Sequence, residues 1–214
     1  MTEPVDVTPP PAAKKYSLAD YLFQFITITA GVLIALLING VVELNNNRRL
    51  VADARATIAR EIADNKHDMD NTLAGIQGDR AKLETAITFA NDLLTARKTD
   101  INKLDFSLNM ADLSSSAWRT AERTGALSYM DYAEVQRYSK LYDFQDLIVE
   151  RQRNMLGQLA AASAILAPGF DPAKPNPRDL ELFRERLMAL HGSLLIHTDM
   201  AKRLADNYAE ALKP

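Results

Sequence analysis

The stretch YLFQFITITAGVLIALLINGVV, residues 21–42, decides the architecture of this chain. It contains no charged residue over 22 positions, and at about 1.5 Å per residue a helix of this length spans about 33 Å. The hydrocarbon core of a bilayer is about 30 Å thick, so the stretch is long enough to cross one. The sequence therefore predicts one transmembrane anchor helix, at residues 17–44.

Two other interpretations of this stretch fit less well. A cleaved signal peptide needs a small-residue cleavage site after its apolar run, but here the run continues into Asn39-Gly40-Val41-Val42-Glu43. A core helix of a soluble protein seldom lacks charge over such a length. We therefore expect an uncleaved single-pass protein of the bacterial inner (cytoplasmic) membrane, with residues 1–16 as a disordered, Pro-rich tail.

One face of the predicted anchor carries residues that suit helix pairing. They are spaced four apart: Thr27, Gly31, Ala35 and Asn39. Small residues let two helix backbones approach closely, and an Asn amide can donate a hydrogen bond across the pair. The pattern favours self-association in the bilayer, although Gly and Ala are also common in membrane helices in general.

The basic residues on either side of the anchor give a slight indication of its orientation. Lys14 and Lys15 precede it, and four arginines follow it: Arg48, Arg49, Arg55 and Arg60. Positive charge concentrates on the cytoplasmic side of membrane helices. The excess after the anchor favours a cytoplasmic domain, and a periplasmic domain stays open.

The composition excludes several classes of partner and site. Lys and Arg number 25 against 28 Asp and Glu, a net charge of −3, which provides no general attraction for nucleic acid. The chain has no cysteine, so disulfides and Cys-based metal sites are ruled out. We expect no nucleic-acid partner. The expected partners are the lipid bilayer and either a second copy or another membrane protein.

Proline and apolar spacing predict an all-α fold. No proline lies between residues 12 and 167, and proline costs about 3 kcal/mol inside a helix. Apolar residues recur every three or four positions in a long amphipathic helix at 45–98 and in two more at about 132–166 and 177–212. With a short helix at about 115–124, residues 99–214 complete an elongated antiparallel helical bundle, or a coiled-coil-like stalk, behind the transmembrane helix.

Local signals predict where these helices begin and end. Gly75 and Gly78 are the weak point of the first helix and predict a kink or break there. Further along, Ser114 to Ser116 are predicted to cap the short helix and Gly125 to end it. A capping box of Asp131 with Glu134 is predicted to begin the next helix, and Pro168-Gly169 to end it. Asn176 with Pro177 is predicted to begin the last helix.

No group of residues forms a recognisable catalytic or cofactor motif. Asp64 and His67, with Glu61 before them, have the spacing of carboxylate and histidine ligands in di-iron bundles. The apolar stripe runs through Ile58, Ile62, Asn65 and Met69, which places Asp64 and His67 off it. We interpret the group as a solvated charged face. We expect no metal and no cofactor, and an enzyme is the least favoured class.

Three polar residues fall within the apolar stripes of the last two long helices. Gln145 and Gln152 are predicted to be buried polar residues that fix helix register. His197 is predicted to be a hydrogen-bonded core histidine, with a pH-sensing role as the alternative.

Two stretches resemble a known group. FITITAGVLIALLINGVVELNNNRR (25–49) and SSSAWRTAERTGALSYMDYAEVQRYSKLYDFQDLI (114–148) together cover about a third of the chain. They resemble a widespread family of uncharacterised bacterial single-pass membrane proteins with a "GILIALQINNW"-like N-terminal span. Gly40-Val41-Val42 stands where those relatives often have Asn-Trp. The resemblance implies architecture and no chemistry.

Four residues of the second stretch predict either a packing junction or a ligand cleft: Trp118, Gly125, Tyr138 and Tyr142. Gly125 would supply a left-handed turn, and Trp118 would cover the helix that begins after Asp131. The main functional hypothesis is a membrane-anchored interaction or scaffold protein that works by helix pairing. The alternative is a membrane-tethered sensory or ligand-binding bundle that acts through a partner.

Overall fold

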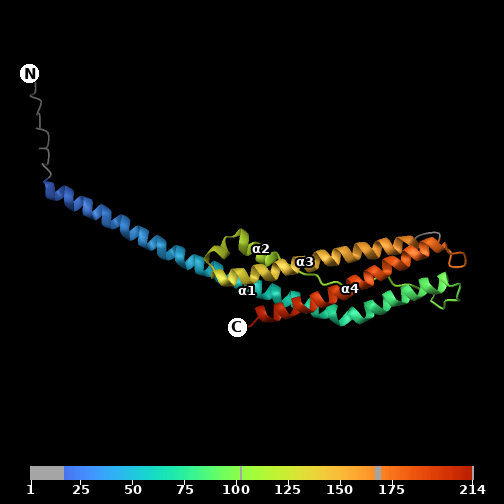
Figure 1. Ribbon diagram of the computed structural model, residues 1–214. Helices are drawn as coiled ribbons and strands as arrows, with labels where there is room; N and C mark the ends of the chain where they lie inside the picture. Colours follow the sequence, from blue (N-terminus) through green and yellow to red (C-terminus); the bar gives the residue numbers. More distant parts are fainter. Residues whose placement is uncertain (1–16, 102, 167–169, 214) are drawn as a thin grey trace, which may run out of the picture. The chain divides into compact units, whose positions relative to one another are not determined.

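The computed structural model describes residues 17–101, 103–166 and 170–213, and this part of the chain is all-α without strands (Figure 1). The elements are α1 (Leu18–Leu94), α2 (Ser116–Arg123), the 3-10 helix η1 (Ala126–Tyr129), α3 (Tyr132–Ser163), the 3-10 helix η2 (Ala164–Leu166) and α4 (Pro177–Ala211). The predicted all-α fold is confirmed. The predicted tail at 1–16, with Lys14 and Lys15, and the stop at Pro168-Gly169 lie outside the described residues.

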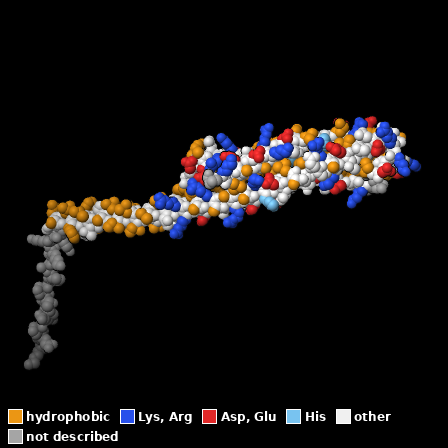
Figure 2. All heavy atoms as spheres, turned by 90° about the horizontal axis from the view of Figure 1, so that it is seen from below, with side chains coloured by type: hydrophobic (Ala, Val, Ile, Leu, Met, Phe, Trp, Pro, Cys, Tyr) orange, Lys and Arg blue, Asp and Glu red, His pale blue; other side chains and the backbone are white. Residues whose placement is uncertain are grey.

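The chain divides into two compact units, Met1–Arg48 and Arg49–Pro214. In the first unit, the apolar side chains of residues 21–42 are exposed on all sides of α1, and Figure 2 shows the visible face of this helix as mostly hydrophobic. Among the described residues, α1 is the one helix that is both long enough and apolar enough to cross a membrane.

In the second unit, side-chain pairs fix the direction of each helix. Gln158 contacts Ser193 and Gln145 contacts Tyr208, so α3 and α4 run antiparallel. Asn65 of α1 contacts Gln145, and Arg55 contacts Glu134 further back along α3, so α1 and α3 run parallel. The three long helices therefore form a bundle in which α4 is antiparallel to both of the others.

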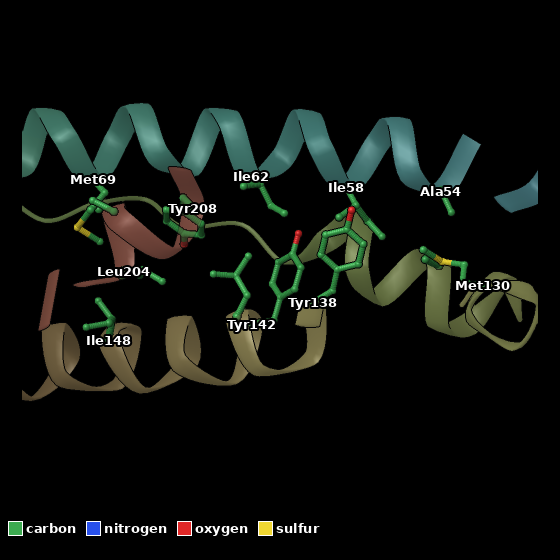
Figure 3. Packing of buried hydrophobic residues seen from close by; sticks show 14 of the residues in the cluster. Ala54, Ile58, Ile62, Met69, Met130, Tyr138, Tyr142, Ile148, Leu204 and Tyr208 are labelled. Carbon is green, nitrogen blue, oxygen red and sulfur yellow. The ribbon is translucent and has the colours of Figure 1, made fainter. Parts of the chain in front are cut away.

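The predicted apolar stripes meet in the interior of this bundle. Figure 3 shows Ile58, Ile62 and Met69 of α1 facing Tyr142 and Ile148 of α3. A second cluster fills the other end of the bundle, around Phe183, Leu187 and Leu190 of α4. Burying a Leu, Ile or Phe side chain contributes about 1.5–3 kcal/mol, so these stripes are the main source of stability.

The connection between α1 and α2 includes an extended segment, residues 103–115, that we call the strap. Lys82 and Glu61 of α1 are 21 residues apart, about 32 Å along a helix. Their partners Ser107 and Ala117 are only ten residues apart. The chain between these partners therefore rises about 3.2 Å per residue, the rise of an extended strand. The strap runs back along α1, and Figure 1 shows it as a thin green connection beside the helices.

Gly75 does not break α1, which is helical through both Gly75 and Gly78. The predicted break is therefore wrong, whereas Figure 1 shows α1 changing direction in its blue-green part, in agreement with the predicted kink. A Cβ atom added at Gly75 would lie 2.7 Å from Nδ2 of Asn109 in the strap. Gly75 lets the strap approach the helix closely, whereas Gly78 has no neighbour within 4 Å of such an atom.

Candidate functional site

Buried polar side chains recur every seven residues on the two helices beside the strap. They are Asn65, Thr72 and Asp79 on α1, and Gln145 and Gln152 on α3. A seven-residue spacing places side chains on one face of a helix. The strap has no secondary structure of its own, so its backbone N–H and C=O groups need partners from elsewhere.

Two of these side chains bind the middle of the strap. The fully buried carboxylate of Asp79 accepts hydrogen bonds from the backbone N–H of Asn109 at 2.8 Å and from its side-chain amide at 2.9 Å. With its amide oriented to match both backbone groups of Ala111, the carboxamide of Gln152 accepts from the N–H at 2.8 Å and donates to the carbonyl at 3.3 Å. Both helices therefore hold the strap by its backbone.

The end of the strap is bound at Ser114. Oδ1 of Asn65 accepts from the N–H of Ser114 at 2.8 Å, and Nδ2 donates to its carbonyl at 2.7 Å. Gln145 donates to the same carbonyl at 2.9 Å, and its oxygen accepts from the hydroxyl of Tyr208 at 2.7 Å. Residues of α1 and α3 thus converge on one strap residue, and Tyr208 of α4 binds one of them.

Glu61 of α1 is the centre of this network. Its carboxylate accepts hydrogen bonds from the Tyr142 hydroxyl of α3 and from the beginning of α2. The N-cap residue Ser115 makes no side-chain capping bond, so Glu61 caps α2 from another helix. The five donors are the hydroxyls of Ser114, Ser116 and Tyr142 at 2.8–2.9 Å and the backbone N–H groups of Ala117 at 2.8 Å and Trp118 at 3.4 Å.

These contacts set the pKa of Glu61 below its ordinary value. Burial is the largest single effect and raises this pKa, but the hydrogen bonds from Ala117, Ser114, Tyr142 and Ser116 together outweigh it. Burial and the bond to Glu61 raise the pKa of the Tyr142 hydroxyl, so it stays protonated and donates. The network therefore carries one charge, on Glu61.

The aromatic residues predicted for this region come together above the network. The Trp118 ring stacks on Tyr142 with centroids 5.4 Å apart and lies 6.3 Å from the ring of Tyr138. Gly125 has φ 75°, the left-handed turn that the sequence predicts between α2 and η1. Because both tyrosines are buried, this geometry supports a packing junction over a ligand cleft.

Several predictions for these residues are corrected by the structure. Glu61 does not belong to a solvated face, because it is 8% exposed and bound by the strap and α2; Asp64 and His67 are exposed. Gln145 and Gln152 are buried as predicted, but their bonds hold the strap as well as a neighbouring helix. The predicted capping by serines holds only for Ser114, whose hydroxyl accepts from the backbone N–H of Ser116 at 3.2 Å, while the hydroxyls of Ser114 and Ser116 both donate to Glu61.

Two further expectations are met only in part. Asp131 caps α3 by accepting from Ala133 and Glu134, but Glu134 does not complete the capping box because its carboxylate binds Arg55 of α1 at 2.5 Å.

His197 is buried, yet neither ring nitrogen has a hydrogen-bond partner among the described residues. Burial and the nearby positive charge of Arg151 hold the pKa of His197 below its ordinary value. Asn176 caps α4 with Pro177 beside it, as predicted.

The predicted pairing face on the anchor part of α1 is open. Nothing in the described chain lies within 4 Å of a Cβ added at Gly31, and Ala35 is exposed. The hydroxyl of Thr27 donates to the carbonyl of Phe23 at 2.8 Å within the helix. The side chain of Asn39 has no partner in the part of the chain that the structure describes.

Comparison with known proteins gives no relative: no protein family, curated protein or solved structure matches this chain.

Proposed function

We propose that this protein is a membrane-anchored interaction or scaffold component that works by helix pairing. The observation that carries this proposal is the exposed, charge-free stretch at residues 21–42 of α1. Apolar side chains on every side of a helix are stable in lipid and unfavourable in water. The bilayer is thus one partner, and the inner membrane is the proposed location, with the bundle on the cytoplasmic side.

Gly31 and Asn39 support pairing with a second copy. The open surface at Gly31 allows the backbone of another helix to come close, which strengthens van der Waals contact in a membrane. An amide without a partner in lipid is unfavourable, and Asn39 of a second chain offers both a donor and an acceptor. The partner is therefore a helix with a similar small-residue face, a second copy first of all.

The bundle contributes a rigid body to this assembly. Its buried network of Glu61, Asn65, Gln145 and Ser114 is occupied by contacts within the chain itself. A network in which the groups satisfy one another fixes one arrangement of the helices. Such a body is suited to holding a partner at a defined place near the membrane.

Disulfide crosslinking tests the pairing face directly, because the chain has no cysteine of its own. In native membranes, Ala35→Cys is expected to form a crosslinked dimer on mild oxidation. Leu33→Cys, on the opposite side of the same helix, is the matched control and is expected to stay monomeric. Equal crosslinking at both positions, or none at Ala35→Cys, would contradict pairing between copies through this face.

A second pair of variants tests whether close approach matters. Adding Gly31→Ile to Ala35→Cys is expected to remove the crosslink, because the branched side chain holds the two helices apart. Ala30→Ile makes a similar small-to-large change off the face and is expected to preserve it. Resistance of the protein to carbonate extraction tests the anchor, and a reporter fused to the C-terminus tests the orientation.

A ligand-binding bundle is the second candidate function, and one observation favours it. A cavity of about 490 Å³ lies between α3 and α4, and Met155 is its one lining residue that also belongs to the buried core. Its size falls in the range of about 300–1,000 Å³ that is typical of small-molecule sites.

A further inference from the structure

The cavity between α3 and α4 has a lining that differs from the rest of the bundle surface. Two arginines contribute to it, Arg151 from α3 and Arg186 from α4. The other polar lining residues are neutral: Asn154, Gln158 and Ser193. No Asp or Glu lines it, although acidic residues outnumber basic ones in the whole chain.

Neither guanidinium is neutralised within the described chain. No ion pair is formed by Arg151 or Arg186, and Nε of Arg151 is buried without a hydrogen-bond partner. The sequence explains this on each helix, because the residues three and four positions away from either arginine include no acid. Lys66, by contrast, has Asp70 four residues later and pairs with it at 2.6 Å.

The neutral groups in the cavity also favour an acceptor ligand. The hydroxyl of Ser193 donates to the side-chain oxygen of Gln158 at 3.1 Å, which leaves the amide N–H₂ of Gln158 to donate. An arginine has five N–H donors and no acceptor. A ligand that only accepts hydrogen bonds and carries negative charge matches this set.

We propose that this cavity binds a small soluble molecule carrying carboxylate or phosphate groups. Arg151 and Arg186 approach it from different helices, so each can bind one anionic group by two parallel N–H···O bonds. Gly157 leaves the α3 side of the cavity open, because no atom lies within 4 Å of a Cβ placed there. The ligand would bridge α3 and α4.

Binding of pyrophosphate and of citrate to the full-length protein in nonionic detergent tests this site, with inorganic phosphate as the single-group probe. Calorimetric titration at low salt is expected to give saturable binding of at least one two-group probe, weaker at higher salt. The double variant Arg151→Gln with Arg186→Gln is expected to weaken that binding by about tenfold or more.

The matched control is Arg137→Gln with Lys140→Gln, which changes the net charge equally. These two residues line another α3–α4 cavity, where Glu210 supplies an acid, and their loss is expected to leave binding unchanged. Thermal unfolding without ligand verifies that both variants fold.

Equal weakening in both variants, or no saturable binding by any probe, would overturn the proposal. The result is independent of pairing in the membrane, because a monomeric protein presents the same cavity.

Discussion

The strap and α4 both run back along α1, but they satisfy their backbones in opposite ways. The helix α4 bonds its own N–H and C=O groups, and the side chains that it buries are almost all apolar. The strap makes no such bonds and depends on Asp79, Gln152 and Asn65. Polar residues are therefore found in the buried stripes of α1 and α3 where an unpaired backbone lies against them.

Removing the carboxylate of Glu61 should lower the stability of the protein more than any other substitution considered below. Glu61→Ala leaves the N-terminus of α2 and the Tyr142 hydroxyl without an acceptor, and we expect a loss of about 3–5 kcal/mol in the free energy of unfolding. Chemical denaturation of the protein in nonionic detergent measures it. Asp64→Ala, an exposed acid on the same helix, is the control and should change stability by less than about 0.5 kcal/mol.

The same substitution has a consequence for acid stability. The lowered pKa of Glu61 means that the unfolded state takes up its proton first, so its contribution is present above pH 4.5 and declines as the pH falls through the folded pKa. As the pH falls below about 4.5, the wild-type protein should lose stability more steeply than Glu61→Ala. Parallel pH profiles of the two proteins would refute a charged Glu61.

Loss of Gln145 should have the next largest effect. Gln145→Leu removes the acceptor of the Tyr208 hydroxyl and one of the two partners of the Ser114 carbonyl, with an expected loss of about 2 kcal/mol in the free energy of unfolding. Gln136→Leu makes the same exchange at an exposed site of α3 and should be nearly neutral. Similar denaturation midpoints for both variants would mean that the strap does not need these bonds.

Gly75 and Gly78 of α1 sharpen the comparison, because the same substitution at these two positions should change stability in opposite directions. Alanine favours a helix by about 1 kcal/mol over glycine, so Gly78→Ala should stabilise the protein by up to that amount. At Gly75 the new methyl group meets Asn109, whose amide is held by Asp79, and we expect a net loss of about 1 kcal/mol. Thermal unfolding of both variants decides the sign, and stabilisation by Gly75→Ala would rule out close strap contact.

His197 should show the smallest effect at neutral pH. It lies in the stripe of α4, and its ring nitrogens have no hydrogen-bond partner among the described residues. His197→Leu removes these buried polar atoms, and we expect the free energy of unfolding to rise by less than about 1 kcal/mol. Its lowered pKa means that the unfolded state binds a proton more readily, so wild-type stability should fall as the pH drops below about 6.5. Unfolding at pH 8 and pH 5.5 checks whether His197→Leu lacks this part of the decline.

Much of the fold can be predicted from the sequence, because long stripes and caps are local signals. The stripes of α1, α3 and α4, the cap at Asn176 and the left-handed Gly125 all follow from spacing and residue type. The partner of a polar residue is not local. Glu61 binds groups that are 53–81 positions away in sequence, and nothing on its own helix distinguishes it from a solvated acid.

The strap itself has a signal that helix-based reasoning overlooks. Leu104, Phe106, Leu108 and Met110 alternate with polar residues, the two-residue period of an extended chain. The seven-residue spacing of Asn65, Thr72 and Asp79 is a second signal, since three polar residues in an apolar stripe require buried partners. Taken together, the two patterns predict an extended segment bound between helices.

Because of that alternation, the packing of the strap depends on whether an odd or an even number of residues is added to it. A helix tolerates a small change in length by rotating gradually, but in an extended chain one added residue turns every later side chain to the opposite side. An insertion between Leu104 and Met110 would direct Phe106 or Leu108 to solvent and move Ala111 and Ser114 away from the amides that bind them. Homologous chains should therefore conserve the number of residues in this segment more strictly than their identity.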